Sequence, residues 1–367
     1  MVIQAMTVEE VQAIVGDGKR ILARGGGTKP ALSTPLEGFQ VLDVTGISGV
    51  VEYDPGEFTF TAQAGTRLEE VQRMLVEHGQ YLPFDPLLAG RGATLGGSVA
   101  AGTSGSGRYH YGGIRDFILG VRFVDSAGQV VHAGGKVVKN AAGFDFPKLM
   151  VGSRGGLGVL VELSFKVFPR PEAYGTLRLD HASLDEALES LRRLMNTPLD
   201  LDALDLEPDV VGCIVWARLG GLASALPGRL ERLCNLMERG EILLGTPEEH
   251  VWHRMRELEW VPENWSLVKV PLTPGRIPAL EAALQRCLED GLLERPVLRR
   301  YCCAGQVGWL ALSEAPIKLD SLLAEQQLSG LALFGPPGRA RLGLIANDVF
   351  AVRVKTALDP DRLFVEI

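Results

Sequence analysis

The sequence predicts an α+β fold built from two domains. The chain has 367 residues, more than most single hydrophobic cores use. With 46% hydrophobic and 22% charged residues, it has the composition of an ordinary globular protein. Glycine-rich loops dominate as far as Pro169–Pro171, where alternating helix and strand patterns take over. We therefore expect a first domain over residues 1–170, a second α+β domain over 171–338, and a C-terminal helix and tail, 339–367, that returns to the first domain.

In the first domain, capping and periodicity predict two helices. The first covers residues 7–15, because Thr7 can cap it, Glu10 follows three residues later as in a capping box, and Gly16 ends it. The second covers residues 68–77, where apolar residues recur on one face. Short apolar runs bounded by turn residues predict strands at 20–24 and 159–168. Three further strands, at 39–43, 49–53 and 57–62, are expected to form one small sheet. Residues 117–134 predict a hairpin that turns at 126–128.

The second domain alternates helices and strands, which favours helices on one face of a sheet. Ser183 caps a helix that runs to residue 194, and further helices are predicted at 223–238, 248–258, 276–289 and 319–327. The predicted strands are 177–179, 210–217, 241–244, 266–270, 297–301, 307–312 and 331–334. In the tail, residues 347–364 predict a helix that stops before Pro360.

Charge and hydropathy exclude several classes of protein. The net charge is −8 and no Lys/Arg block occurs, which argues against a nucleic-acid binder. No apolar run approaches the roughly 20 residues of a membrane span. The first 15 residues lack the basic start and apolar core of a signal peptide. These features predict a cytoplasmic protein, and attachment to the inner face of the plasma membrane through partners stays open.

The five cysteines do not predict a metal or disulfide framework. Their number is odd, all lie in the second half, and no CxxC or iron–sulfur spacing occurs. We therefore expect no metal. Cys302 and Cys303 are adjacent and could form a redox pair, but two buried strand cysteines are the favoured interpretation.

A run of three glycines, Gly25–Gly27, follows the strand predicted at residues 20–24 and precedes Thr28 and Lys29. It lacks the GxxxxGK[ST] spacing of a P-loop, and no GxGxxG spacing occurs in the first half. Consecutive glycines can still turn their backbone N–H groups toward one point and hold a pyrophosphate, with Thr28 adding a hydroxyl. Taken alone, the run is more simply a tight turn.

Two more small-residue segments change this interpretation. They are "ATLGGSVAAGTSG" at residues 93–105 and "GSRGGLG" at residues 152–158. One such segment is usually a turn, whereas three predict a long ligand that lies against the backbone along its length. A dinucleotide fits that description better than a mononucleotide.

The first half resembles the flavin-binding domain of the vanillyl-alcohol oxidase / p-cresol methylhydroxylase family. The stretches that match in order and spacing are "RGGGTK", "FDPLLAGRGATLGGSVAAGTSG", "RYHYGGIRDFILGVRFVDSAGQVV" and "GSRGGLGVLVELSFKVFP", over residues 20–169. The stretch "KVVKNAAGFDFPKLMVGSRGGLGVL" is most similar to GlcE-type subunits of bacterial glycolate oxidase. The resemblance implies a two-part FAD-binding domain of the p-cresol methylhydroxylase type and a ferredoxin-like α+β cap domain. It also implies two partners, a larger flavin subunit and an iron–sulfur subunit.

The resemblance assigns cofactor contacts by position. The first glycine segment would hold the pyrophosphate, and the residues around position 85 would border the flavin. The second segment would line the rest of FAD, and the third would contribute backbone groups near its adenine or ribose end. The implied cofactor-binding residues are Arg24, Gly25, Gly26, Gly27, Thr28, Lys29, Pro83, Asp85, Pro86, Ala93, Thr94, Leu95, Gly96, Gly97, Ser98, Gly102, Thr103, Ser104, Gly105, Gly158 and Val159.

Two departures from the family pattern concern histidine. Covalent members carry a histidine in or near the first loop, where this chain has Thr28 and Lys29, so we expect non-covalent FAD. Members that oxidise 2-hydroxy acids carry histidine motifs in the C-terminal half, and none of these occurs here. His250 and His253 share a helix face, but a surface pair is the favoured interpretation. The sequence therefore identifies no catalytic base.

Three functions remain open at this level. The chain is expected to be the FAD-binding subunit of a glycolate oxidase complex that assists oxidation of glycolate or D-lactate to the 2-oxo acid. Alternatively, it is a self-sufficient FAD oxidoreductase in which Arg91, Arg108, Tyr109, Tyr111 or Arg115 grips a substrate carboxylate. A non-catalytic scaffold is the third alternative, and the intact glycine segments argue against it.

Overall fold

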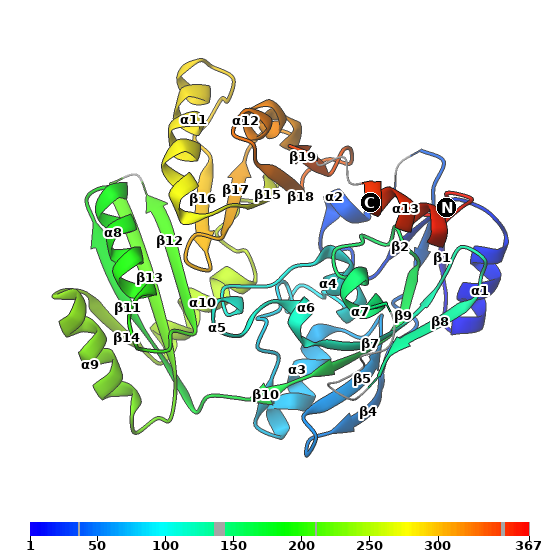
Figure 1. Ribbon diagram of the computed structural model, residues 1–367, viewed down its shortest axis with the longest axis horizontal. Helices are drawn as coiled ribbons and strands as arrows, with labels where there is room; N and C mark the ends of the chain where they lie inside the picture. Colours follow the sequence, from blue (N-terminus) through cyan, green and yellow to red (C-terminus); the bar gives the residue numbers. More distant parts are fainter. Residues whose placement is uncertain (36, 136–143, 210, 346–348, 367) are drawn as a thin grey trace. The chain divides into compact units, whose positions relative to one another are not determined.

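The computed structural model describes residues 1–35, 37–135, 144–209, 211–345 and 349–366. It divides into two compact units (Figure 1). Unit 1 comprises residues up to Ser104, then Gly112–Arg170, and the C-terminal residues from Val349. Unit 2 comprises Gly105–Tyr111 and Pro171–Ile345. Whether these units fold as the independent domains predicted from the sequence stays a prediction. Val210, the family-like stretch 136–143 and residues 347–348 of the predicted tail helix lie outside the described residues.

Unit 1 begins with a small parallel sheet covered by a helix. Its strand order is β1-β3-β2, from β1 (Val2–Gln4), β3 (Gln40–Asp43) and β2 (Ile21–Arg24). The helix α1 (Val8–Gly16) buries Val11 and Val15 against Ile21 and Leu42. As predicted, Thr7 caps α1, because its hydroxyl accepts a hydrogen bond from the backbone of Glu10 at 3.2 Å.

The second sheet of unit 1 is antiparallel and has the order β4-β5-β9-β7-β8. The prediction of one small sheet from residues 39–62 is wrong, because β3 pairs in parallel with β1 and β2 while β4 and β5 pair with each other. The strands are β4 (Val50–Asp54), β5 (Thr59–Gln63), β9 (Val159–Lys166), β7 (Ile118–Val124) and β8 (Val130–Gly134). The hairpin β7–β8 turns where it was predicted to turn.

Short elements connect these sheets. The helix α3 (Leu68–Glu77) has the predicted bounds. The others were not predicted: α2 (Pro30–Ser33), α4 (Leu95–Ala101), α6 (Ile114–Phe117), α7 (Phe146–Met150), and the strand pair β6 (Gln80–Tyr81) and β10 (Phe168–Pro169). The C-terminal helix α13 (Val349–Leu358) is followed by a tail in which Leu363 accepts a backbone hydrogen bond from Ile21 at 2.7 Å.

Unit 2 is built around one nine-stranded sheet, in the order β14-β11-β13-β12-β16-β17-β15-β18-β19. Two copies of a β-α-β-β-α-β motif account for eight strands, and they meet where the second strand of each copy pairs, at β12 and β16. The first copy is β11 (Ala173–His181), α8 (Leu184–Met195), β12 (Ala203–Asp209), β13 (Gly212–Gly221), α9 (Leu226–Met237) and β14 (Glu241–Leu244). The second is β15 (Ser266–Pro271), α11 (Ile277–Glu289), β16 (Leu298–Cys302), β17 (Val307–Leu312), α12 (Asp320–Glu325) and β18 (Ser329–Phe334), followed by β19 (Arg341–Gly343).

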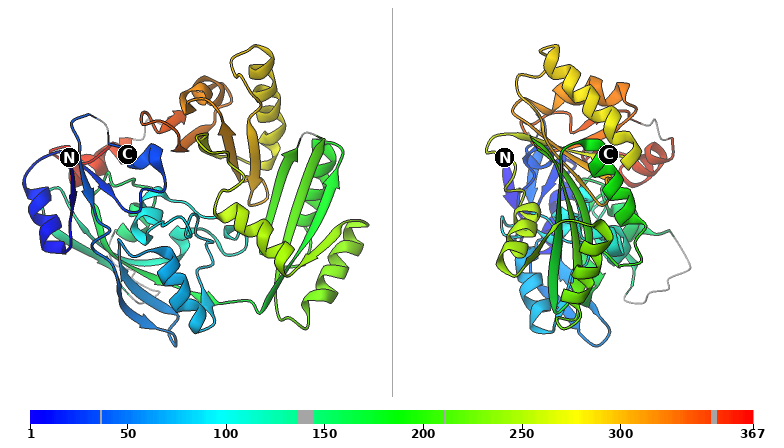
Figure 2. Two further views of the ribbon diagram at one scale, coloured as in Figure 1. Left: turned by 180° about the vertical axis from the view of Figure 1, so that it is seen from behind. Right: turned by 90° about the vertical axis from the view of Figure 1, so that its left-hand side faces the viewer.

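The sequence led us to expect all helices of unit 2 on one face of its sheet, and this expectation is wrong. A Cβ atom on Gly175 would meet Leu230 of α9, whereas the next residue, Thr176, accepts a hydrogen bond from Trp252 of α10 (Thr246–Arg256). Successive strand residues point to opposite faces, so α9 and α10 lie on opposite faces. Figure 2 shows α10 on the face away from α8 and α11.

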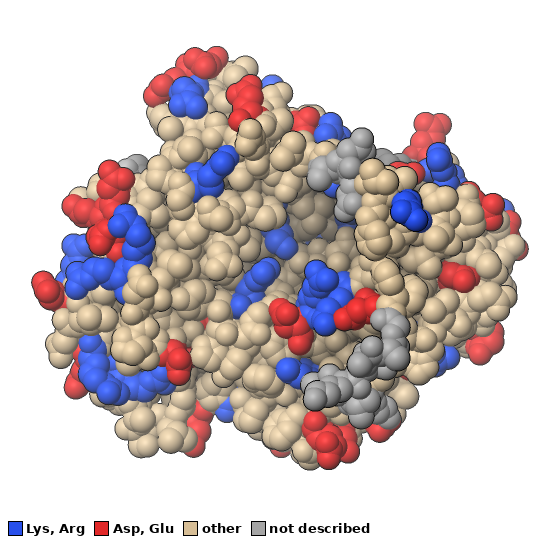
Figure 3. Space-filling model, in the orientation of Figure 1, with Lys and Arg blue, Asp and Glu red and all other residues tan. Residues whose placement is uncertain are grey.

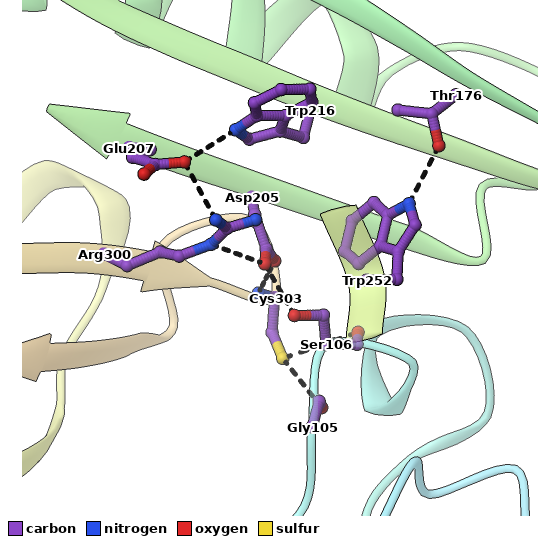
Figure 4. Close-up of polar contacts among 9 residues, drawn as sticks. All are labelled: Gly105, Ser106, Thr176, Asp205, Glu207, Trp216, Trp252, Arg300 and Cys303. Atoms are coloured by element: carbon purple, nitrogen blue, oxygen red, sulfur yellow. Dashed lines mark hydrogen bonds and ion pairs between the residues drawn. The ribbon is translucent and has the colours of Figure 1, made fainter. Parts of the chain in front are cut away.

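A buried polar cluster joins the segment Gly105–Tyr111 to the sheet of unit 2 (Figure 4). The carboxylate of Asp205 is fully buried and accepts hydrogen bonds from the Ser106 hydroxyl at 2.5 Å and the Cys303 backbone at 3.2 Å. Arg300 lies 3.4 Å from Asp205 and 2.8 Å from Glu207. Because the Asp205 carboxylate binds both the Ser106 hydroxyl and the Cys303 backbone, this cluster fixes the short helix α5 (Arg108–Tyr111) on the sheet.

Candidate cofactor-binding site

Each residue of the first glycine segment needs to be glycine, Gly25 and Gly26 because of close packing and Gly27 because of its backbone conformation. A Cβ atom on Gly25 would lie 2.2 Å from the Thr94 hydroxyl, and one on Gly26 would lie 2.0 Å from the Gly92 carbonyl oxygen. Gly27 has a φ of +65°, which disfavours other residues. The segment therefore turns directly against the start of the second small-residue segment.

The third segment lies against the second. The backbone N–H of Gly152 donates to Val99 at 2.9 Å, and that of Arg154 donates to Ala100 at 2.8 Å. Gly102 ends α4 with a φ of +61°. A side chain there would meet Gly152, about 3.1 Å away. The three segments thus meet within unit 1, around α4.

A cavity lies where these segments meet, and its charged lining is cationic. Among the described residues that line it, Arg24, Lys29 and Arg154 carry positive charge and none is acidic. Arg24 is paired with Asp43, which does not itself line the cavity, at 3.1 Å. The described residues that line it are Ala23, Arg24, Gly25, Gly26, Gly27, Thr28, Lys29, Leu32, Ser33, Thr94, Gly97, Ala100, Ala101 and Arg154. Such a cavity suits an anionic ligand that approaches the backbone closely.

Three buried hydroxyl groups near the same segments lack hydrogen-bond partners within the described residues. They are Ser98 Oγ and Thr103 Oγ1 in the second segment and Ser153 Oγ in the third. A buried polar atom without a partner is costly, so native structures rarely leave one. A ligand with several polar edges would satisfy these groups, and a flavin dinucleotide has such edges along its length.

Some of the residues predicted to bind the cofactor line the cavity, and others do not. Arg24 to Lys29, Thr94 and Gly97 line it, while Pro83, Asp85 and Pro86 do not. Ala93, Leu95 and Val159 are buried in the core of unit 1. Gly96 and Gly158 pack against Ala64 and Phe123. Ser98, Gly102 and Thr103 lie on or beside α4, Ser104 accepts a hydrogen bond from the Ile114 backbone, and Gly105 belongs to unit 2.

Two residues of the third segment were missed as site candidates. Sequence reasoning assigned roles there to Gly158 and Val159, yet Arg154 lines the cavity and Ser153 carries an unpartnered hydroxyl. Arg154 has a φ of +55°, unusual for a residue with a side chain. A cationic residue inside a run of glycines was the available signal.

All six histidines are among the residues that the structure describes, and none of them lines this cavity. His110 contacts the carbonyl oxygen of Leu201 at 3.2 Å, and His253 lies 3.3 Å from Glu259. The pKa of His181 is lowered by burial and by the neighbouring Arg239. Within the described part of the chain, no group of three or more His, Cys, Asp and Glu side chains is placed to hold a metal ion.

Comparison with known proteins identifies the family. The family model "FAD binding domain" matches residues 1–134. Glycolate oxidase subunit GlcE of Escherichia coli (strain K12) is 38% identical over 250 residues, which cover 68% of this chain and 67% of that protein. The chain belongs to the GlcE family of FAD-binding proteins. Its cofactor is FAD, as predicted.

Relatives of lower sequence identity include another glycolate oxidase subunit and a D-lactate dehydrogenase. Glycolate oxidase subunit GlcD of Bacillus subtilis (strain 168) is 28% identical over 82% of this chain and 63% of its own length. D-lactate dehydrogenase of Anaerostipes hadrus is 28% identical over 58% of this chain and 45% of its own length. This chain thus spans less than two thirds of each of these two proteins. The family of this chain is one of FAD-dependent oxidoreductases.

A solved structure confirms the predicted fold. Alkyldihydroxyacetonephosphate synthase aligns with a TM-score of 0.74 over 99% of this chain and 76% of its own, at 16% identity. At that identity the likeness concerns the fold alone. The GlcE-family chain therefore combines an FAD-binding unit of the p-cresol methylhydroxylase type with an α+β cap.

Proposed function

We propose that this chain is the FAD-binding subunit of a glycolate oxidase complex and assists the oxidation of glycolate or D-lactate to the 2-oxo acid. The observation that carries the proposal is the cationic, glycine-walled cavity of unit 1 in a chain 38% identical to a glycolate oxidase subunit. In that cavity the backbone of Gly25–Gly27, with Thr28 and Lys29, would hold the diphosphate of non-covalently bound FAD.

The missing base supports a subunit rather than a complete enzyme. When bound, FAD supplies a two-electron acceptor for hydroxy-acid oxidation, and a second group must take the hydroxyl proton. None of the six histidines lines the cavity. We therefore assign the proton acceptor, and the main hydroxy-acid site, to the larger flavin subunit, with an iron–sulfur subunit as the second partner.

The proposed partners also bear on where in the cell the chain is located. Within the described residues, no helix has both the length and the apolar character needed to cross a bilayer. We propose a cytoplasmic chain that attaches to the inner face of the plasma membrane only through its partners.

One observation in unit 2 favours a self-sufficient enzyme as the second candidate. Burial, together with the smaller effect of the nearby Arg108 on α5, lowers the pKa of Lys269 on β15 to about 8. Two cations that repel each other at a partly buried site can bind a carboxylate between them, because its negative charge offsets their repulsion. In this alternative, Lys269 and Arg108 would bind the carboxylate of a small hydroxy acid.

Flavin reduction distinguishes the two functions. The chain is purified alone and together with its natural partners, and flavin absorbance is followed after anaerobic addition of glycolate or D-lactate. The subunit proposal predicts a yellow protein that bleaches only when the partners are present. Bleaching of the isolated chain would establish the self-sufficient enzyme, and a colourless chain that binds no added FAD would establish a scaffold.

A further inference from the structure

Lys29 is buried, and no residue that the structure describes pairs with its charge. Its side chain is only 5% exposed, although it carries a strongly hydrated ammonium group. Within the described residues, Nζ has one polar contact, a long one of 3.5 Å to the hydroxyl of Thr28. No carboxylate of the described part of the chain lies beside it, and burial lowers its pKa to about 8.

An unpaired buried ammonium is one of the costliest groups a protein can hold. Folding does not require it, because a methionine would fill the same volume with apolar atoms. The side chain instead lines the cavity of unit 1, next to the backbone of Gly25–Gly27. Of the described residues that line the cavity, none is an anion that could pair with Lys29.

The other charged groups around the cavity do not supply that anion. Arg24 from β2 and Arg154 from the segment before β9 are cations, and arginine stays protonated at every relevant pH. Asp43 on β3 is committed elsewhere: it pairs with Arg24 and accepts hydrogen bonds from Thr45. Burial raises the pKa of Asp43, but these contacts outweigh burial and lower it overall, so the carboxylate stays ionised.

We infer that Lys29 is the counter-ion of the FAD diphosphate, and that binding of this group draws a proton onto the Lys29 amine. The inference rests on the proposed role of unit 1 in holding FAD, and it is independent of the substrate. The backbone N–H groups of Gly25–Gly27 cannot have this role, because an amide N–H cannot take up a proton.

The sign of the pH dependence follows from the free site. Below pH 8 the Lys29 amine is already charged, so the diphosphate binds without proton uptake. Above pH 8 the amine is mostly neutral, and the diphosphate, which raises its pKa, binds only together with a proton. The affinity for FAD should then fall by up to roughly tenfold for each pH unit above 8.

The test compares FAD with riboflavin, which has the same ring system but no phosphate. Affinities are measured by calorimetry at pH 7 and pH 9 for the full wild-type chain, for Lys29→Met and for Lys19→Met. Lys19 is a matched control, because it is exposed and lies in the same unit. Proton uptake is obtained at pH 8.5 from titrations in two buffers of different ionisation enthalpy.

We expect Lys29→Met to bind FAD about 10- to 100-fold more weakly at pH 7, the range of one charge-assisted contact, with riboflavin binding unchanged. The wild type and Lys19→Met should take up a proton with FAD at pH 8.5, and Lys29→Met should not. The inference is overturned if the wild type takes up no proton, or if Lys29→Met weakens riboflavin as much as FAD. The proton measurement needs no variant, so it decides even if Lys29→Met does not fold. A wild type that binds no flavin would overturn the FAD assignment itself.

Discussion

The hydroxyl of Ser106 donates a 2.5 Å hydrogen bond to the fully buried carboxylate of Asp205. Ser106 belongs to a glycine-rich stretch of the chain's first half, whereas Asp205 lies on β12, 99 residues later. The same carboxylate also holds the backbone of Cys303 and faces Arg300. One side chain therefore joins three distant parts of the sequence within unit 2 (Figure 4).

Replacing Asp205 with alanine should destabilise unit 2. The change leaves Arg300 buried with Glu207 as its remaining anion and removes the acceptor of Ser106, so we expect a loss of about 3 kcal/mol in the free energy of unfolding. Urea denaturation followed by tryptophan fluorescence measures this loss. The exposed carboxylate Glu231 is the control, and its alanine variant should stay within about 0.5 kcal/mol of the wild type. A loss below about 1 kcal/mol for Asp205→Ala would show that the cluster is not stabilising.

Gly26→Ala should reduce flavin retention. Glycine adopts a positive φ more readily than other residues, and within this run the structure has that conformation at Gly27. At Gly26 the obstacle is the Gly92 carbonyl, 2.0 Å from where a Cβ atom would be. The two segments must separate, at a cost of about 1–3 kcal/mol, and the diphosphate site opens. Flavin absorbance per chain after purification measures the effect. Gly16→Ala, which meets no atom within 4 Å, should retain flavin as the wild type does.

Lys29 should contribute increasing stability to the cofactor-free protein as the pH rises from 8 to 10.5. In that window Lys29 is neutral in the folded state but charged in the unfolded state, where its pKa is 10.5. The unfolded state thus binds more protons, and stability increases with pH. Lys29→Met should remove this contribution and stabilise the cofactor-free chain at pH 7 by about 1–3 kcal/mol. Urea unfolding at pH 7, 8.5 and 10 without FAD tests this. Equal pH slopes in wild type and variant would contradict it.

Local signals explain what the sequence could predict. The helix capped by Ser183, the strand β14 and the strand β17 were placed correctly because a cap or an apolar run marks each of them. The helix α4 was missed because Gly96 and Gly97 disfavour helices. It forms because Thr94 caps it and because Leu95 and Val99 are buried by the surrounding fold.

Distant partners explain what the sequence could not predict. The strand β12 was missed because Asp205 and Glu207 are unusual inside a strand, and their partner Arg300 lies more than 90 residues away. The same holds for the cavity. The glycine run was visible in the sequence, but the burial of Lys29 and the approach of Arg154 depend on how three separate segments pack.

The last prediction concerns the C-terminal tail of unit 1. The amine of Lys355, 7% exposed, pairs with the buried carboxylate of Asp359 at 2.5 Å and donates to the carbonyl of Gly156 at 2.7 Å. Asp359 in turn accepts the backbone N–H groups of Leu363 and Phe364. Because the pair holds the tail against β2, Asp359→Ala should lower the free energy of unfolding by about 3–5 kcal/mol.

Proteolysis separates this effect from a general loss of stability. Without Asp359 the tail loses the acceptor of two backbone groups, so carboxypeptidase should remove it from the folded chain, and truncation is followed by mass spectrometry. Asp361→Ala is the matched control, because that carboxylate is exposed two residues away. It should remain as resistant as the wild type. If Asp359→Ala unfolds at a lower urea concentration but keeps its tail intact under digestion, the pair stabilises α13 and does not hold the tail.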